Sequence, residues 1–191
     1  MIVLAALAAC GPKNYSYAYQ NEPDPHKGEL LLGVGDVLDI NVWDQKDLNT
    51  EATIRPDGTI TMPLVGDMLA VGMTPVALKE EIKKSLTNFV KLGGGNEITV
   101  AVKAWKSYRF TVQGEVSRPG LYNNDEWVTV ADALALAGGP TRFAKRSDIV
   151  LMRKDPKGER RAIPLDFDLL ASGKRPDMNI WVLPGDVIYV P

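Results

Sequence analysis

The sequence predicts an α+β fold divided into two small domains. Short stretches in which apolar and polar residues alternate, as in half-buried strands, recur in both halves of the chain. Each half also carries helix-start signals, at Thr74 and at Thr129, and these helices lie among runs of strands rather than alternating regularly with them. A chain of 191 residues is long enough for one domain or two small ones, and the repeated pattern favours two.

The composition is that of an ordinary globular protein, with 45% apolar and 24% charged residues. A net charge of -2 means that there is no basic excess, which argues against nucleic acid as the main partner. A folded chain of this size buries about 70% of its unfolded surface and requires no disulfide bonds. After residues 1–9, no apolar run approaches the ~18 residues that indicate a membrane-spanning helix.

Residues 1–9 have the features of a secretory signal peptide. The run is uncharged and apolar, and it is too short to cross a bilayer as a helix. It ends at Leu7-Ala8-Ala9-Cys10-Gly11, which resembles the lipobox of bacterial lipoproteins, and Cys10 is the only cysteine. We therefore predict cleavage before Cys10 and lipidation of its thiol; the alternative is a buried N-terminal strand. A signal peptide normally opens with Lys or Arg, and the absence of both before Cys10 favours a translation start upstream of Met1.

The residue that follows Cys10 bears on location. By resemblance to the sorting rules of lipoproteins, Gly11 rather than Asp at this position implies transfer to the outer membrane. Each buried acyl methylene contributes ~0.8 kcal/mol, and about two chains suffice for stable anchoring. We expect a protein that is held on the outer membrane by its acyl chains and faces the periplasm.

Residues 10–28 are predicted to form a lipidated tether. The stretch is polar, carries proline and glycine, and has almost no aliphatic side chains, so its composition does not provide a core. It contains His26, the only histidine of the chain.

The first domain is predicted to span residues 29–104. A strand is expected over residues 36–43, where apolar and polar side chains alternate. Residues 53–64 form an expected hairpin, with a type I turn at Pro56-Asp57 and Gly58 in a left-handed bulge. One face of its return strand carries Ile60, Met62 and Leu64.

A helix is expected after this hairpin, because Thr74 can cap it and Pro75 suits its first position. The apolar residues at roughly helical spacing are Val76, Ile82, Leu86, Phe89 and Val90. The glycine cluster at 93–95 ends the helix, and a further strand follows at residues 98–102.

The second domain, residues 105–191, is expected to place strands around one short helix. Its first strand includes residues 108–112 and leads to a turn at Pro119-Gly120. The segment from Thr129 to Asp132 has the form of a capping box that opens the helix, and Gly138-Gly139-Pro140 ends it. Later strands are expected at residues 149–152, 161–163, 181–183 and 187–190.

One short pattern occurs near both ends of the predicted folded region. Gly35-Asp36 and Gly185-Asp186 each precede an apolar strand, and glycine followed by aspartate suits a tight turn. Two independent turn-to-strand junctions and a duplicated unit both explain this echo. Asp36, Asp57 and Asp186 are interpreted as turn residues rather than catalytic acids.

Ordered motifs along the chain resemble those of the outer-membrane polysaccharide export proteins. Those that resemble the polysaccharide export domain are residues 32–43, 55–60, 63–66 and the helix after Thr74. Those that resemble the soluble-ligand-binding β-grasp (SLBB) domain are residues 114–122, 129–141 and 183–191. Val34 stands where the family usually has proline. Together the motifs cover nearly all of the chain after the tether, in the family's order.

This resemblance to Wza-like proteins implies a lipoprotein subunit of a capsule or exopolysaccharide export translocon. Such proteins form rings whose periplasmic domains enclose the polymer path above an inner-membrane copolymerase. The expected partners are therefore the polysaccharide cargo, further copies of the chain and that copolymerase. The sequence has one β-grasp unit and ends at Pro191 without an amphipathic helix, so a separate outer-membrane β-barrel is expected to supply the pore.

No catalytic, metal-binding or cofactor-binding residue is predicted. One histidine and one lipidated cysteine cannot supply a Ser-His-Asp triad or a histidine-rich metal site within one chain. Neither a GxxxxGK[ST] loop nor a GxGxxG fingerprint occurs. We therefore expect a protein that is not an enzyme. The alternative function is a periplasmic lipoprotein module that binds a glycan without exporting it; a glycan-cleaving enzyme with two carboxylates is a third hypothesis.

The tryptophans require separate consideration. Trp43 and Trp105 are both expected to face outward from their strands, and Trp127 lies in an expected loop. An aromatic face beside hydrogen-bonding groups is typical of sugar sites, whereas tryptophan is also enriched at protein interfaces. The interface is the preferred interpretation, and no sugar-binding residue is assigned.

Overall fold

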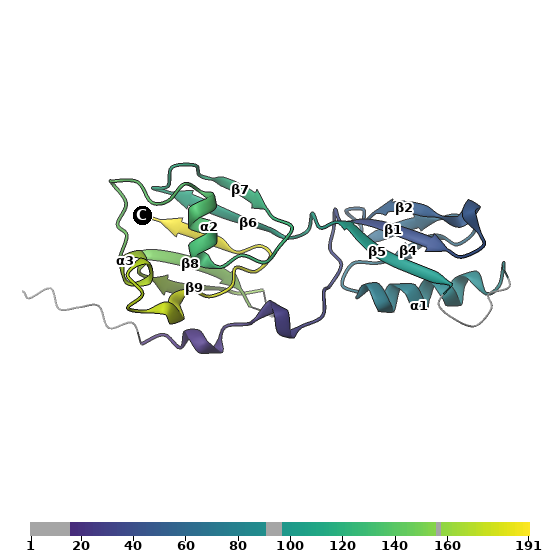
Figure 1. The fold of residues 1–191 in the computed structure, drawn as a ribbon, viewed down its shortest axis with the longest axis horizontal. Coiled ribbons are helices and arrows are strands. Elements are labelled where there is room, and N and C mark those ends of the chain that lie inside the picture. The colour runs from purple at the N-terminus through teal and green to yellow at the C-terminus, as the bar shows by residue number, and fades with distance from the viewer. Residues whose placement is uncertain (1–15, 91–96, 156–157) are drawn as a thin grey trace, which may run out of the picture.

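A computed structural model describes residues 16–90, 97–155 and 158–191. The predicted signal peptide, Cys10 and the glycine cluster at 93–95 lie outside these residues. Figure 1 shows two lobes joined by extended segments, and each lobe contains its own hydrophobic core. The predicted α+β class with two small domains is confirmed.

The first domain is built on a three-stranded antiparallel sheet in the order β2-β1-β5. Its strands are β1 (Val37–Val42), β2 (Thr50–Thr53) and β5 (Ile98–Ala104). A separate antiparallel pair is formed by β3 (Thr59–Met62) and β4 (Gly66–Leu69). The helix α1 (Pro75–Leu86) packs beside β5, and the core lies between these elements.

The helix α1 begins as predicted but buries a different face. The Thr74 side chain accepts a hydrogen bond from the Ala77 amide at 3.1 Å, and proline occupies the first position. The fully buried side chains are Leu78, Ile82 and Leu86. The predicted inclusion of Val76 and Phe89 is wrong, because both are exposed. Successive residues of a helix are rotated by about 100°, so Val76 points away from the buried stripe of Leu78, Ile82 and Leu86. Phe89 lies beyond the last residue of the helix.

The predicted hairpin at 53–64 is a turn between two sheets. Gly58 has φ +82°, and its amide donates to the Arg55 carbonyl at 2.9 Å, so the predicted turn is confirmed. However, β2 pairs with β1 and β3 pairs with β4, so the two arms do not form one ladder. Leu64 does not share the buried face of β3, because it lies at φ +65° in the loop that leads into β4 and is exposed.

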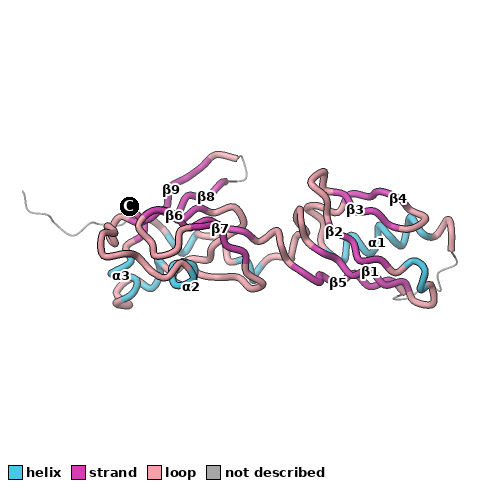
Figure 2. Tube along the Cα trace, turned by 90° about the horizontal axis from the view of Figure 1, so that it is seen from above, coloured by secondary structure: helices cyan, strands magenta, loops and turns pink. Residues whose placement is uncertain are grey.

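The second domain contains a five-stranded sheet in the order β7-β6-β10-β8-β9. Its strands are β6 (Arg109–Gly114), β7 (Gly120–Asn123), β8 (Ile149–Lys154), β9 (Arg160–Leu165) and β10 (Val187–Val190). The pair β10–β6 is parallel, and the other pairs are antiparallel. The helices α2 (Val130–Leu136) and α3 (Phe167–Ala171) cover the same face of the sheet (Figures 1 and 2).

Local signals in the second domain have mixed outcomes. The capping box of Thr129 and Asp132 is confirmed, since each side chain bonds the other's backbone amide. The strand predicted at 181–183 is wrong, because Trp181 makes only a single bridge, to Thr129 at the start of α2. The helix α3 was not predicted.

The segment 16–28 departs from the expected tether. Tyr19 is only 2% exposed and packs into the core of the second domain, and its hydroxyl donates to the Pro164 carbonyl. Figure 1 shows this segment running along the second domain before it enters the first. The prediction that this stretch provides no core side chain is therefore wrong, because an aromatic residue supplies the apolar surface that aliphatic residues do not.

Candidate functional site

The open face of the first domain's sheet ends in a single exposed indole. Strand β1 directs Leu38, Ile40 and Val42 into the core, so alternate residues face outward. Trp43 follows this outward parity at the end of the strand, and 79% of its surface is exposed. Its predicted outward orientation is confirmed.

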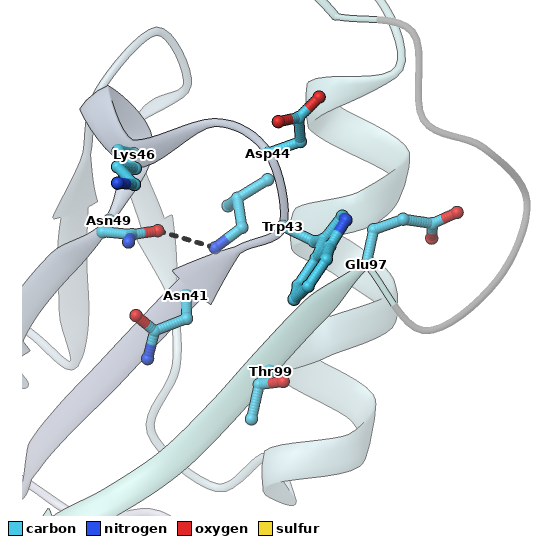
Figure 3. A pocket seen from close by; sticks show the side chains of 8 residues that line it. Asn41, Trp43, Asp44, Lys46, Asn49, Glu97 and Thr99 are labelled. Carbon is cyan, nitrogen blue, oxygen red and sulfur yellow. Dashed lines mark hydrogen bonds between the residues drawn. The ribbon is translucent and has the colours of Figure 1, made fainter.

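Neighbouring strands place hydrogen-bonding groups beside this indole. Asn41 pairs with Thr99 of β5 in the sheet register, so their side chains share the outward face. The Trp43 amide donates to the Glu97 carbonyl at 2.7 Å, which extends the pairing by one residue. Figure 3 shows Trp43, Asn41 and Thr99 on the same side of the two strands.

The loop after Trp43 has a defined conformation. Asp44 adopts φ +60°, a left-handed geometry that aspartate tolerates better than most residues, and this turns the chain away from the sheet. The Asn49 side-chain oxygen accepts a hydrogen bond from the Val42 amide at 2.8 Å (Figure 3), and Leu48 is buried. These two contacts fix both ends of the loop to the domain, so Trp43 stands on an ordered support.

The indole borders an open hollow of about 580 Å³. This volume lies within the range of roughly 300–1,000 Å³ typical of small-molecule sites. The lining residues are Asn41, Val42, Trp43, Asp44, Lys46, Asn49, Glu97 and Thr99. The hollow therefore combines one aromatic surface with amide, hydroxyl and charged groups.

A second cluster, in the other domain, is a buried ion network. Arg153 is 3% exposed; its Nη2 lies 2.6 Å from Asp186 and its Nη1 lies 2.7 Å from Glu22. Arg161 also forms an ion pair with Glu22 at 2.7 Å, and the Tyr17 hydroxyl donates a hydrogen bond to the Glu22 carboxylate. Burial raises the pKa of Asp186, while the Arg153 guanidinium opposes this rise. The network joins the segment 16–28 to the second domain.

One feature of the sequence indicates this network. Arg153 continues the inward parity of Ile149 and Leu151 on β8, and a buried arginine requires an anionic partner. The identity of that partner could not be predicted, because Glu22 is 131 residues away in the sequence.

The three predicted turn aspartates make the contacts expected of turns. Asp36 accepts from the Gly33 amide at 2.8 Å and Asp186 from the Leu183 amide at 2.7 Å. Asp57 accepts from the hydroxyl and amide of Thr59, and these hydrogen bonds hold its pKa below the ordinary value.

The other three tryptophans each pack against another ring. The predicted outward orientation of Trp105 is wrong: its ring stacks on Tyr108 at 4.8 Å and meets Trp127 edge-on at 4.5 Å, at the border of the second core. His26 lies against Trp181, with 4.6 Å between ring centres, and its Nδ1 lies 3.2 Å from a carboxylate oxygen of Asp24, which accepts a hydrogen bond when Nδ1 carries a proton. Across the described residues, no group of three or more His, Cys, Asp or Glu side chains is arranged to hold a metal ion.

Two family models match the chain in succession. The model described as polysaccharide biosynthesis/export protein matches residues 24–103, and the SLBB domain model matches residues 109–164. The chain belongs to the polysaccharide export family. The first match contains the core of the first domain, whereas the second match contains only part of the core of the second domain, which also includes Tyr19 and side chains between Leu165 and Val190. In the part of the chain that the structure describes, no helix has the length and apolar character needed to cross a membrane.

Several curated proteins are similar to this polysaccharide export family member. The EPS I polysaccharide export outer membrane protein EpsA of Ralstonia nicotianae is 27% identical, over 83% of this chain and 46% of that protein. The capsule polysaccharide export outer membrane protein CtrA of Neisseria meningitidis serogroup A is 29% identical, over 86% of this chain and 45% of that protein. The exopolysaccharide production protein ExoF of Rhizobium meliloti is 33% identical, over 74% of this chain and 33% of that protein. The chain thus spans less than half the length of these relatives.

Proposed function

We propose that the chain is a lipoprotein subunit of an outer-membrane apparatus that exports a capsule or exopolysaccharide. The observation that carries this proposal is the succession of an export domain and an SLBB domain on one chain. The names of EpsA and CtrA, which specify polysaccharide export at the outer membrane, support the same role and location. The protein acts as a structural part of the conduit and not as an enzyme.

Assembly and partners form part of the proposal. Copies of the chain associate into a ring in the periplasm that encloses the polymer path, which requires two different complementary surfaces on each subunit. The ring docks on an inner-membrane copolymerase, and a separate β-barrel supplies the pore across the outer membrane. If the purified chain by itself formed polymer-permeable channels in lipid, the β-barrel would be unnecessary.

Deletion of the gene tests the export function. We expect surface polysaccharide to disappear while cell-associated polymer persists, and a plasmid-borne copy to restore the surface material. Unchanged surface polysaccharide in the deletion strain would contradict the proposal. Adjacent genes for glycosyltransferases, a flippase and a copolymerase would further favour export.

Substitution of Cys10 tests the lipid anchor. Cys10→Ser removes the thiol that would be acylated, so we expect the variant to move from the membrane fraction to the soluble periplasmic fraction. Retention of the variant on the membrane would show that another part of the protein provides the attachment.

The second candidate function is a periplasmic glycan-binding module that does not take part in export. The hollow beside Trp43 favours it, because an aromatic surface among hydrogen-bonding groups is typical of ligand sites. The deletion experiment separates the two functions, since a pure binding module leaves surface polysaccharide in place.

A further inference from the structure

We infer that the hollow beside Trp43 binds an uncharged sugar residue within a glycan chain, with one face of its pyranose ring on the indole. The inference rests on the proposed function and names the part of the cargo that this site contacts. It concerns Trp43, Asn41, Asn49 and Thr99, which we call the Trp43 site.

The first argument is the composition of the sheet face. The outward residues of β1 and its partners are mostly polar, as Asp39 pairs with Glu51 and Asn41 pairs with Thr99. Among the described residues, Trp43 is the one large apolar side chain at this end of a polar face. A protein-binding surface is expected to have an apolar centre with several anchors, whereas here one aromatic ring is surrounded by polar groups.

The second argument is the state of the polar groups. Within the described residues, no hydrogen bond engages the side-chain amide of Asn41 or the hydroxyl of Thr99. The side-chain oxygen of Asn49 accepts a hydrogen bond from the Val42 amide, and this contact fixes the orientation of the Asn49 side chain. The NH₂ group of the same side chain therefore has a defined direction. Amides and hydroxyls both donate and accept, and therefore match the hydroxyl groups on the edge of a sugar ring.

The third argument is the match in shape. The axial C–H groups of a pyranose form an apolar patch that fits the face of an indole, and removal of both from water is favourable. The hollow of about 580 Å³ accommodates a ring beside the indole while remaining open at the surface. An open site allows a polymer to pass across it, and a path for a moving polymer requires weak contacts.

The charge of the hollow determines the class of sugar. Among the eight described residues that line it, Lys46 is the single cation and Asp44 is an exposed carboxylate, while the Glu97 carboxylate is largely buried and ion-paired with Lys83 of α1 at 3.7 Å. Recognition of an acidic sugar normally uses arginine or several cations. The site therefore favours an uncharged residue over a uronic or sialic acid.

The support for Trp43 indicates that the site is formed before the ligand arrives. The loop is held by the Asn49–Val42 hydrogen bond and the buried Leu48, and the Trp43 amide is paired with Glu97. A preformed site loses less conformational entropy on binding. Binding should therefore not require a rearrangement of the sheet.

The test measures binding of oligosaccharide fragments, prepared from the surface polysaccharide of the producing strain, to the purified chain by titration calorimetry and NMR. We expect weak binding by the wild-type protein, with Kd on the order of 1 mM. Trp43→Ala should weaken it about tenfold, and Trp43→Phe should weaken it less because a smaller aromatic face remains. Asn41→Ala combined with Thr99→Val should also weaken it severalfold.

Phe143→Ala is the matched control, because Phe143 is 69% exposed and lies in the other domain. It should bind as the wild-type protein does, and circular dichroism should show every variant to be folded. If the fragments contain uronic acids, reduction of their carboxyl groups should preserve or increase the affinity. Tighter binding of the acidic form would overturn the assignment to an uncharged sugar.

Two outcomes would overturn the inference as a whole. One is the absence of binding by the wild-type protein, or equal binding by the wild type and Trp43→Ala. The other is a change in oligomeric state on Trp43→Ala, measured by sedimentation, without a change in glycan binding, which would identify a contact between subunits. Because binding is measured on the purified protein, loss of export in the deletion strain together with unaltered Trp43→Ala binding would reject the site alone and leave the export function standing.

Discussion

The turn at residues 33–36 and the turn at residues 183–186 have the same backbone design. Gly35 has φ +93° and Gly185 has φ +82°, and each precedes a buried aspartate. Each aspartate accepts a hydrogen bond from the amide three residues earlier, at 2.8 Å in the first turn and 2.7 Å in the second. A strand of its domain's core follows in both cases.

The two turns differ in the second partner of the carboxylate. Asp36 accepts from the amide of Ser107 at 2.7 Å and from its hydroxyl at 2.9 Å, so the first turn is fastened to the segment that leads into the second domain. Asp186 instead binds Arg153, which also binds Glu22 of the N-terminal segment. The same local pattern thus organises a turn in both places, while its tertiary partners determine whether it holds a linker or an N-terminal segment.

The strands that follow the turns also differ in their pairing. Strand β1 is antiparallel to both neighbours, whereas β10 is parallel to β6 and antiparallel to β8. A duplicated unit would be expected to keep its pairing. The structure therefore favours two independent turn-to-strand junctions, one of the two explanations that the sequence left open.

Removal of the Arg153 guanidinium should have the largest effect. Arg153→Met leaves Glu22 and Asp186 buried without their shared cation, which is expected to cost about 3–5 kcal/mol of unfolding free energy. Urea denaturation followed by a probe in the second domain measures the loss. Arg161→Met is the control, because Arg161 is 43% exposed and should cost less than about 1 kcal/mol. Similar costs for the two variants would mean that the network is not a buried structural unit.

Removal of the Asp36 carboxylate should have the next largest effect. Asp36→Ala leaves the amides of Gly33 and Ser107 without their acceptor and should destabilise the first domain by about 1–3 kcal/mol. It should also speed hydrogen exchange at the Ser107 amide and proteolysis of the adjacent linker. Ser107→Ala removes only the hydroxyl contact and should cost about 1 kcal/mol. Undiminished protection of the Ser107 amide in Asp36→Ala would argue against the linker contact.

The shared backbone design predicts equal costs for one substitution in the two turns. Gly35→Ala and Gly185→Ala each force a side chain into the left-handed region, at about 1–2 kcal/mol. Steric differences are small, because an added Cβ would lie 3.7 Å from Lys106 in the first turn and meet nothing within 4 Å in the second. Gly120→Ala, with neither a positive φ nor a close neighbour, should be nearly neutral. Thermal denaturation of the three variants would reveal any inequality between the turns.

The smallest expected effect concerns the N-terminal segment at alkaline pH. Burial raises the pKa of Tyr19 from 10.0 to about 12. The unfolded chain ionises first, so the contribution of Tyr19 to stability is complete below about pH 10 and is lost as the pH rises towards 12. Tyr19→Phe should cost about 1 kcal/mol at neutral pH, since it loses one hydrogen bond, and should make the alkaline decline shallower. An unchanged decline would mean that Tyr19 ionises as readily in the folded protein as in the unfolded one.

Local chemistry was sufficient to predict several elements. Thr74 with Pro75, and Thr129 with Asp132, begin helices because the required contacts lie within three residues. The turn at Gly58 and the alternation of β1 were predicted for the same reason, and the outward orientation of Trp43 followed from that alternation. Strand parity alone therefore predicted that this side chain is exposed, but it did not assign the residue to a binding site.

The predictions that failed depended on what an element packs against. Val76 and Leu78 are both apolar, and only the position of β5 beside α1 decides which of them is buried. Trp105 has the parity of an exposed residue but stacks on Tyr108 where the second core begins. The lining of the hollow could not be assembled either, because Thr99 joins Asn41 through a pairing across 58 residues of sequence.

The sequence by itself determined the α+β class, the division into two domains, the turn chemistry and the family, because these depend on periodicity and on contacts between residues close in the chain. Only the tertiary structure decided that Glu22 reaches Arg153, that Asp36 fastens the linker, and that Asn41, Thr99 and Trp43 border one hollow. Each of these contacts joins segments that are distant in the sequence. A buried charge or an exposed amide indicates what kind of partner it needs, but it does not indicate where in the chain that partner lies.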